Sequence, residues 1–323
     1  MTKELLLQNG RQLGTFVGLI VVTTVFWILS PYFLTVSNLM NIAEQASINA
    51  VIAVGMTFVI IAAGIDLSVG SIVALSGVVL AGALQSNVPV VPAILLGLGV
   101  GALCGLSNGL LISYGRLPPF IATLGMMSVA RGAALFYTDG RPVSGFSPEF
   151  RSLATGTIAQ IPSPVIIMIV LYILAHGILN RTNLGRYTYA IGGNEEAANL
   201  SGINTRMIKT TIYGLCGMLS GLAAVILTAR LNSAQPIAGM MYELDAIAAV
   251  VIGGTSLLGG EGKISGTLIG VLIMGILRNG LNLLGLSSFT QQVVIGSVII
   301  LAVLIDMALR KDRTFMLEKG IAK

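Results

Sequence analysis

Long apolar runs, separated by short polar breaks or by glycine and proline, occupy most of the chain. Several runs are close to the length of about 20 residues that a helix needs to cross a bilayer. The runs near 47–85 and 245–284 are nearly continuous, so a count of nine spans stays open beside a count of about ten. The pattern predicts spans at residues 14–33, 47–64, 67–85, 90–113, 119–138, 163–180, 208–230, 245–259, 264–284 and 289–309.

Composition excludes the water-soluble and disordered classes of protein. Hydrophobic residues make up 55% of the 323 residues, and charged residues make up only 10%, against about 25% in a typical soluble domain. The mean hydropathy is +0.91, and disordered chains are poor in apolar residues. We therefore expect an all-α, polytopic membrane protein in which residues 1–323 form a single transmembrane domain without a soluble domain.

The basic residues predict the orientation of the helices. The chain has 18 Lys and Arg against 13 Asp and Glu, an excess that the positive-inside rule explains without a nucleic-acid partner. With both termini cytoplasmic, the loop 139–162 lies outside and the loop 181–207 lies inside. Three basic residues then face out: Arg141, Arg151 and Arg230. The 13 that face in are Lys3, Arg11, Arg116, Arg181, Arg186, Arg206, Lys209, Lys263, Arg310, Lys311, Arg313, Lys319 and Lys323.

Signatures of catalysis and of metal binding are missing from the sequence. His176 is the single histidine, so a triad or a histidine-based metal site lacks its parts. Cys104 and Cys216 both lie in apolar runs and are expected to be reduced packing residues. The glycine-rich run 259–264 has Ile264 where a phosphate loop needs a magnesium-binding Ser or Thr. We expect no catalytic site, no metal site and no bound ATP in this chain.

Two glycine-flanked breaks interrupt the apolar runs. The first is 64–70, where Asp66 and Ser68 either cap the following helix or lie beside a transport path. The second is 253–260. Broken helices in both halves of a membrane protein are the best sequence indication of such a path, although these two breaks do not occupy equivalent places in a repeat of five spans.

Four charged residues lie in or beside apolar runs. Glu243 and Asp245 are expected at the outer mouth of the bundle, where they either meet a polar ligand or partner or are simply solvated. Arg131 and Arg278 are costly against lipid, so they should face the bundle, the membrane interface or a partner. The sequence does not pair them.

Glycines recur every four residues along one predicted span. This spacing makes a smooth helix face that another backbone can approach closely, so it predicts tight helix packing. The stripe consists of Gly97, Gly101, Gly105 and Gly109, and a similar set on another span consists of Gly214, Gly217 and Gly221.

The inner loop 181–207 contains a helix signal. Asn194 is a good N-cap, followed by two acidic residues and alanines, and Gly202 fits a C-terminal stop. These residues predict a short helix of about two turns on the cytoplasmic surface. It is either a solvated amphipathic linker or a docking helix for a soluble motor protein.

The ordered set of motifs resembles the membrane permease of bacterial ABC importers of the ribose and simple-sugar type. The set covers nearly the whole chain, and one departure is Pro118, where many relatives have a different residue. The matching stretches are 53–57, 64–71, 115–124, 184–187, 192–195, 229–230 with 233–236, 242–257 and 279–284.

The resemblance implies a permease that works as a pair, expected to be a homodimer, in the bacterial inner membrane. It implies two ATPase subunits that bind the ATP and Mg²⁺, a periplasmic sugar-binding protein and a monosaccharide substrate, with ribose as the best single expectation. The ATPase-coupling residues would be Gly193, Asn194, Glu195, Ala198 and Gly202. A weakly polar path suffices if the binding protein supplies the affinity, so we expect the translocation path to be lined by Asn49, Ser68, Thr255 and Ser256 and shaped by Asp66.

Two other hypotheses remain at this stage. An autonomous ion-coupled secondary transporter would need a titratable group within the membrane, and Asp66 is the candidate. An intramembrane enzyme would need the nucleophile, base or metal ligands that the sequence lacks.

Overall fold

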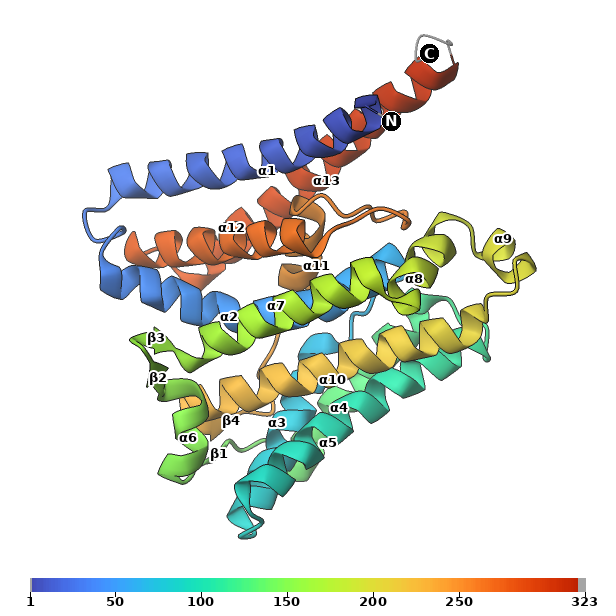
Figure 1. The fold of residues 1–323 in the computed structure, drawn as a ribbon. Helices are drawn as coiled ribbons and strands as arrows, with labels where there is room; N and C mark the ends of the chain where they lie inside the picture. The colour runs from blue at the N-terminus through green and yellow to red at the C-terminus, as the bar shows by residue number, and fades with distance from the viewer. Residues whose placement is uncertain (1, 319–323) are drawn as a thin grey trace.

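The computed structural model describes the backbone of residues 2–318 and the side chains of residues 14–301, 303 and 304. Helices dominate this part of the chain (Figure 1). They are α1 (Thr2–Leu29), α2 (Val36–Ile61), α3 (Val69–Gln85), α4 (Val90–Ser113), α5 (Pro119–Thr138), α6 (Pro148–Thr155), α7 (Ser163–Arg181), α8 (Asn183–Gly193), α9 (Glu195–Leu200), α10 (Thr205–Leu231), α11 (Tyr242–Ile252), α12 (Ile264–Leu283) and α13 (Ser288–Glu318).

Each predicted span overlaps a helix, although α2 begins eleven residues before its predicted start and the span 245–259 runs seven residues past α11. Fewer helices meet the requirements for crossing a bilayer. Six helices in the described part are long and apolar enough: α2, α4, α5, α7, α10 and α12. The apolar parts of α1, α3 and α13 are shorter. Helix α11 has 11 residues, about 16 Å at 1.5 Å per residue, which is too short to cross alone. Ten crossings therefore stay a prediction.

The two long loops lie at opposite ends of the bundle. Helix α6 lies at one end, and α8 and α9 lie at the other, together with the start of α1 and the end of α13 (Figure 1). Which end faces the cytoplasm stays a prediction. Some of the basic residues on which this predicted orientation depends lie outside the part of the chain whose side chains are described: Lys3, Arg11, Arg310, Lys311, Arg313, Lys319 and Lys323.

The loop 139–162 is irregular, as its prolines predict, and short strands hold it in place. Strand β1 (Val143–Ser144) pairs antiparallel with β4 (Ser233–Ala234), directly after α10. Strands β2 (Thr157–Ile158) and β3 (Ile161–Pro162) form a small hairpin before α7. The loop is thereby fastened to the ends of α10 and α7.

Helices α4 and α10 cross at backbone contact distance. A Cβ placed on Gly101 would collide with the carbonyl oxygen of Gly217, and a Cβ on Gly217 would collide with that of Gly101. A Cβ on Gly221 would lie 2.9 Å from the carbonyl oxygen of Gly97. The prediction that the glycine stripe mediates tight helix packing is confirmed.

Helices α2 and α12 are joined by polar side chains instead. The amides of Asn38 and Asn279 exchange two hydrogen bonds of 3.0 and 2.9 Å, and both side chains are buried. Further along, the hydroxyls of Thr57 and Thr267 lie 2.8 Å apart. These pairs set the register of the two antiparallel helices.

Candidate functional site

The predicted short helix in the inner loop is confirmed as α9. The Asn194 side chain caps it by accepting a hydrogen bond of 2.9 Å from the amide of Ala197. Glu195 and Glu196 occupy the first turn, where acidic groups are favourable to the helix dipole. Gly202 follows with φ +86°, the left-handed conformation that ends many helices.

Helix α9 presents an apolar side chain to solvent while its other face is held by the protein. Leu200 is 83% exposed, whereas Ala198 is 5% exposed. Lys209 of α10 forms an ion pair of 2.9 Å with Glu195. An open groove of about 560 Å³ lies beside α9, with a lining that includes Arg116, Glu196, Asn199 and Arg206. The arrangement is an exposed knob beside a charged groove, which suits a protein partner.

Helix α8 connects this surface to both broken segments. A Cβ on Gly192 would collide with the carbonyl oxygen of Ile61 at the end of α2. That same oxygen accepts a hydrogen bond of 2.9 Å from the amide of Gly260. The hydroxyl of Tyr189 donates to the carbonyl oxygen of Gly262 at 2.6 Å. Burial raises the pKa of Tyr189 to about 12, so its hydroxyl remains a donor at neutral pH.

The first break does not use the predicted side-chain cap. The Oδ1 atom of Asp66 accepts from the backbone amide of Ser68 at 2.9 Å and from the Ser68 hydroxyl at 2.6 Å. Ser68 occupies the N-cap position of α3 without bonding the first turn. Asn108 of α4 donates to the Ser68 hydroxyl at 2.9 Å. Asp66 therefore closes the turn on Ser68, since a two-residue spacing favours a local Asx turn over a cap.

The second break, which contains Thr255 and Ser256, packs against α8, since a Cβ on Gly259 would lie 2.8 Å from the carbonyl oxygen of Gly192. Thr255 and Ser256 are both fully buried. The amide of Ser256 donates to the backbone carbonyl oxygen of Glu261 at 2.9 Å, and the Ser256 hydroxyl accepts from the amide of Leu258 at 3.1 Å. Asn49 is not part of this group, because it precedes Ile61 by twelve residues of α2, about 18 Å along the helix.

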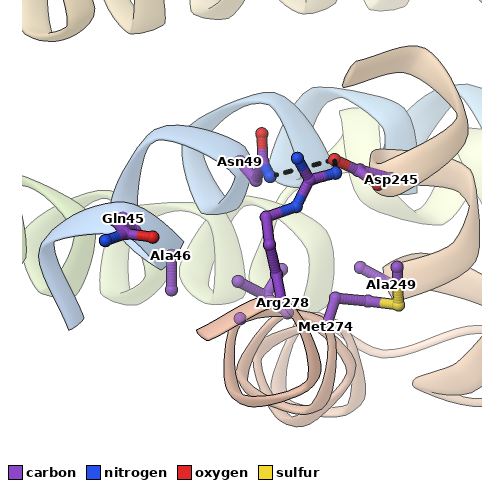
Figure 2. Close-up of a pocket in the computed structure, with 9 residues that line it drawn as sticks. Gln45, Ala46, Asn49, Asp245, Ala249, Met274 and Arg278 are labelled. Carbon is purple, nitrogen blue, oxygen red and sulfur yellow. Dashed lines mark hydrogen bonds and ion pairs between the residues drawn. The ribbon is translucent and has the colours of Figure 1, made fainter. Parts of the chain in front are cut away.

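Asn49 instead belongs to a charged cluster between α2, α11 and α12 (Figure 2). The guanidinium of Arg278 donates to the carboxylate of Asp245 at 2.6 Å, and the amide of Asn49 lies 3.5 Å from the same oxygen. Asp245 is only 3% exposed, so the alternative that it is simply solvated is wrong, while its place at the outer mouth stays a prediction. It is buried because α11 begins inside the bundle, level with the middle of α2.

The other two charged residues are also held by the protein. The Oε2 atom of Glu243 lies over the first turn of α3, where it would be 2.6 Å from a Cβ on Gly70. Arg131 donates to the carbonyl oxygens of Pro236 and Ala238 at 2.8 and 2.7 Å. Of the three surroundings expected for Arg131 and Arg278, the structure shows contacts with the bundle for both side chains.

Three residues at these sites were given no role from the sequence, although Gly192 stands in the matching stretch 192–195. Tyr189 and Gly192 lie in α8, whose packing depends on the tertiary fold. Asn108 carried a usable signal, because an amide side chain between Gly105 and Gly109 is rare in an apolar span and marks a polar contact; the structure buries it fully.

Comparisons with known proteins assign the family. A family model described as "Branched-chain amino acid transport system / permease component" matches residues 38–303. The chain is 54% identical over 298 residues to "Ribose import permease protein RbsC" of Bacillus subtilis (strain 168), covering 92% of each chain.

Two further relatives come from Escherichia coli (strain K12). Identity is 51% to its "Ribose import permease protein RbsC", over 94% of this chain and 95% of that protein. It is 42% to "D-allose transport system permease protein AlsC", over 92% of each chain. No solved structure matches the chain.

The resemblance expected from the motifs is thus confirmed over most of the length, and the chain is a multi-pass protein of the bacterial inner membrane. The chain belongs to the family of membrane permease components that the matching model describes.

Proposed function

We propose that this permease imports D-ribose as the membrane subunit of an ABC importer. The observation that carries the proposal is the 54% identity to a ribose import permease across 92% of both chains. The working unit is a homodimer over two ATPase subunits, and a periplasmic binding protein delivers the sugar. The ATPase subunits bind the ATP and Mg²⁺. Nothing in the structure or the comparisons favours the ion-coupled alternative.

The ATPase docks on α9 and the groove beside it. The exposed Leu200 and the capped, acidic first turn of α9 support this assignment. The short helix enters the partner as a rigid unit, because its cap and its ion pair to Lys209 are already formed. The coupling residues in this proposal are Gly193, Asn194, Glu195, Ala198 and Gly202.

Movement of α9 reaches the bundle through the α8 contacts with both breaks. Gly192 leaves no clearance against Ile61, and Tyr189 holds the α11–α12 loop by Gly262. A displacement of α8 therefore shifts the ends of α2 and α11 together. A packed junction of this kind transmits rigid-body motion, which alternating access requires.

The translocation path runs along the inner side of α2. Asn49 lines its middle section, and Thr255 and Ser256 lie toward its α8 end. Asp66 and Ser68 shape the turn between α2 and α3 and are fully buried in this conformation. A weakly polar path suffices, because the binding protein supplies the affinity for the sugar.

Reconstituted transport tests the proposal. Proteoliposomes holding this permease, its ATPase and its binding protein should accumulate D-ribose only when ATP and the binding protein are both present. An ATPase variant that binds but does not hydrolyse ATP is the control and should abolish uptake. Uptake of another sugar instead would disprove the substrate. Uptake without the ATPase, driven by an ion gradient, would disprove the importer and make Asp66→Asn the next variant.

A further inference from the structure

A polar strip runs along the groove between α2 and α12. On α2, Asn41, Gln45 and Asn49 follow one another at a spacing of four residues and so share one helix face. On α12, Arg278 and Asn282 have the same spacing, and the amide oxygen of Asn282 accepts a hydrogen bond of 3.1 Å from Gln291 of α13. Each of these five side chains is partly or fully exposed, and Gln45, Asn49 and Arg278 line one small cavity (Figure 2). We call these five residues the polar strip.

Arg278 shows that the polar strip does not face lipid. Its side chain is 39% exposed, although its partner Asp245 is 3% exposed. It lies within a helix that is long and apolar enough to span the membrane. Helical side chains lean toward the helix N-terminus, so Arg278 extends into the bundle instead of reaching the nearby end of α12. A partly exposed guanidinium in this place is costly against hydrocarbon, so the face meets water or protein.

The cavity beneath the polar strip has an apolar wall and one polar atom that accepts no hydrogen bond. Among the described residues, Oδ1 of Asn49 is buried and has no hydrogen-bond partner. The wall is made by Ala46, Ala249 and Met274. The volume of about 20 Å³ holds a single water molecule. A hydroxyl group could take that place and donate to Asn49.

We propose that the polar strip is one wall of a monosaccharide contact site. Amide, carboxylate and guanidinium groups together offer the donors and acceptors that sugar hydroxyls need, and the methyl-rich wall suits the faces of the sugar ring. A cavity of one water cannot enclose a pentose, so the strip contacts one side of the sugar. The other side faces the second permease copy. The inference rests on the proposed function in naming the ligand class.

Cysteine labelling tests whether the polar strip meets water. In a Cys104→Ala background, Gln45→Cys is compared with Leu103→Cys, an apolar position on α4 that is 66% exposed. The assembled complex is placed in nanodiscs and treated with a sulfonated, water-soluble maleimide. We expect Gln45→Cys to react at least tenfold faster than Leu103→Cys. Equal, slow reaction at both positions would overturn the proposal.

Protection by substrate tests whether sugar occupies the strip. D-ribose-loaded binding protein with ATP should slow the labelling of Gln45→Cys at least fivefold. Empty binding protein with ATP is the control and should leave the rate within twofold. Equal rates with loaded and empty binding protein would show a water-filled surface without sugar contact, which also overturns the proposal.

Transport by variants separates this inference from the proposed function. Asn49→Ala should lower D-ribose uptake about tenfold relative to ATP hydrolysed, because a sugar contact is lost. Glu44→Gln, on α2 like Asn49, is the matched control. It breaks the 3.7 Å ion pair with Arg230 of α10 and should change uptake less than twofold. If wild type imports D-ribose and Asn49→Ala does so equally well, the contact site is disproved while the importer stands. If wild type imports no D-ribose, the proposed function itself fails.

Discussion

The α4–α10 and α2–α12 contacts hold pairs of membrane helices together by different interactions. Two helices in a membrane gain little from burying apolar surface, because lipid tails are equally apolar. Helices α4 and α10 associate by bringing glycine backbones together. Helices α2 and α12 associate through the Asn38–Asn279 amide pair and the Thr57–Thr267 hydroxyl pair. The glycine contact holds the backbones of α4 and α10 in one close arrangement. The paired polar groups of α2 and α12 can separate and form new hydrogen bonds, which suits helices that move during transport.

The largest expected effect comes from breaking the glycine crossing. Gly101→Ala places a methyl group against the carbonyl oxygen of Gly217 and 3.0 Å from the amide nitrogen of Gly221. We expect a loss of about 2 kcal/mol in stability, because an overpacked backbone contact has no flexible side chain to yield. Thermal unfolding of the purified permease measures it.

A matched variant on the same helix controls for the added methyl group. Gly99 has no atom within 4 Å of the position of its Cβ. Gly99→Ala should therefore be neutral or stabilising by about 0.5 kcal/mol, since alanine favours helix over glycine. Equal destabilisation by both variants would mean that helix propensity, and not the crossing, decides the outcome.

A smaller effect is expected from the amide pair, and it should be reversible. Asn38→Leu leaves the buried Asn279 without partners and should destabilise the permease by about 1 kcal/mol, the scale of such bonds in membranes. The double variant Asn38→Leu with Asn279→Leu should recover stability, because neither amide remains unsatisfied. Thermal unfolding of both single variants and the double variant gives the coupling energy; strict additivity would argue against the pair.

The smallest structural change tests the link between α8 and the second break. Tyr189→Phe removes only the hydrogen bond to Gly262, so stability should change by no more than about 1 kcal/mol. Uptake of D-ribose per ATP hydrolysed should nevertheless fall about fivefold, because α8 then moves without the α11–α12 loop. Tyr187→Phe on the same helix is the control. A proportional loss of uptake and ATP hydrolysis in Tyr189→Phe would indicate poor assembly and not lost coupling.

Much of the fold follows from local patterns in the sequence. The predicted limits of 90–113 and 119–138 coincide with those of α4 and α5, because prolines mark both starts. Helix α9 was predictable from Asn194 and Gly202, because a helix cap and a glycine stop depend only on residues close to them in the sequence. The α4 glycine stripe was predictable because its period lies within one helix.

The charged cluster depended on contacts that no local pattern contains. Asp245 follows a turn in which Met241 adopts φ +70° and Gly239 packs against Gly70. This turn brings the start of α11 into the bundle, so a residue expected at the outer mouth lies beside Arg278. The partners are 33 residues apart in sequence, and only the path of the chain between them determines that they meet.

The glycine crossing also has a consequence for how the protein is made. Helix α4 ends at Ser113 and α10 begins at Thr205, so 91 residues separate the two partners. At a synthesis rate of about 5–20 residues per second, α4 waits in the bilayer for roughly 5–18 seconds before α10 emerges. During that interval its smooth face has no matching backbone. The first half of the permease is therefore completed only by the second, and a ribosome that stalls between them leaves an inserted but unfinished bundle.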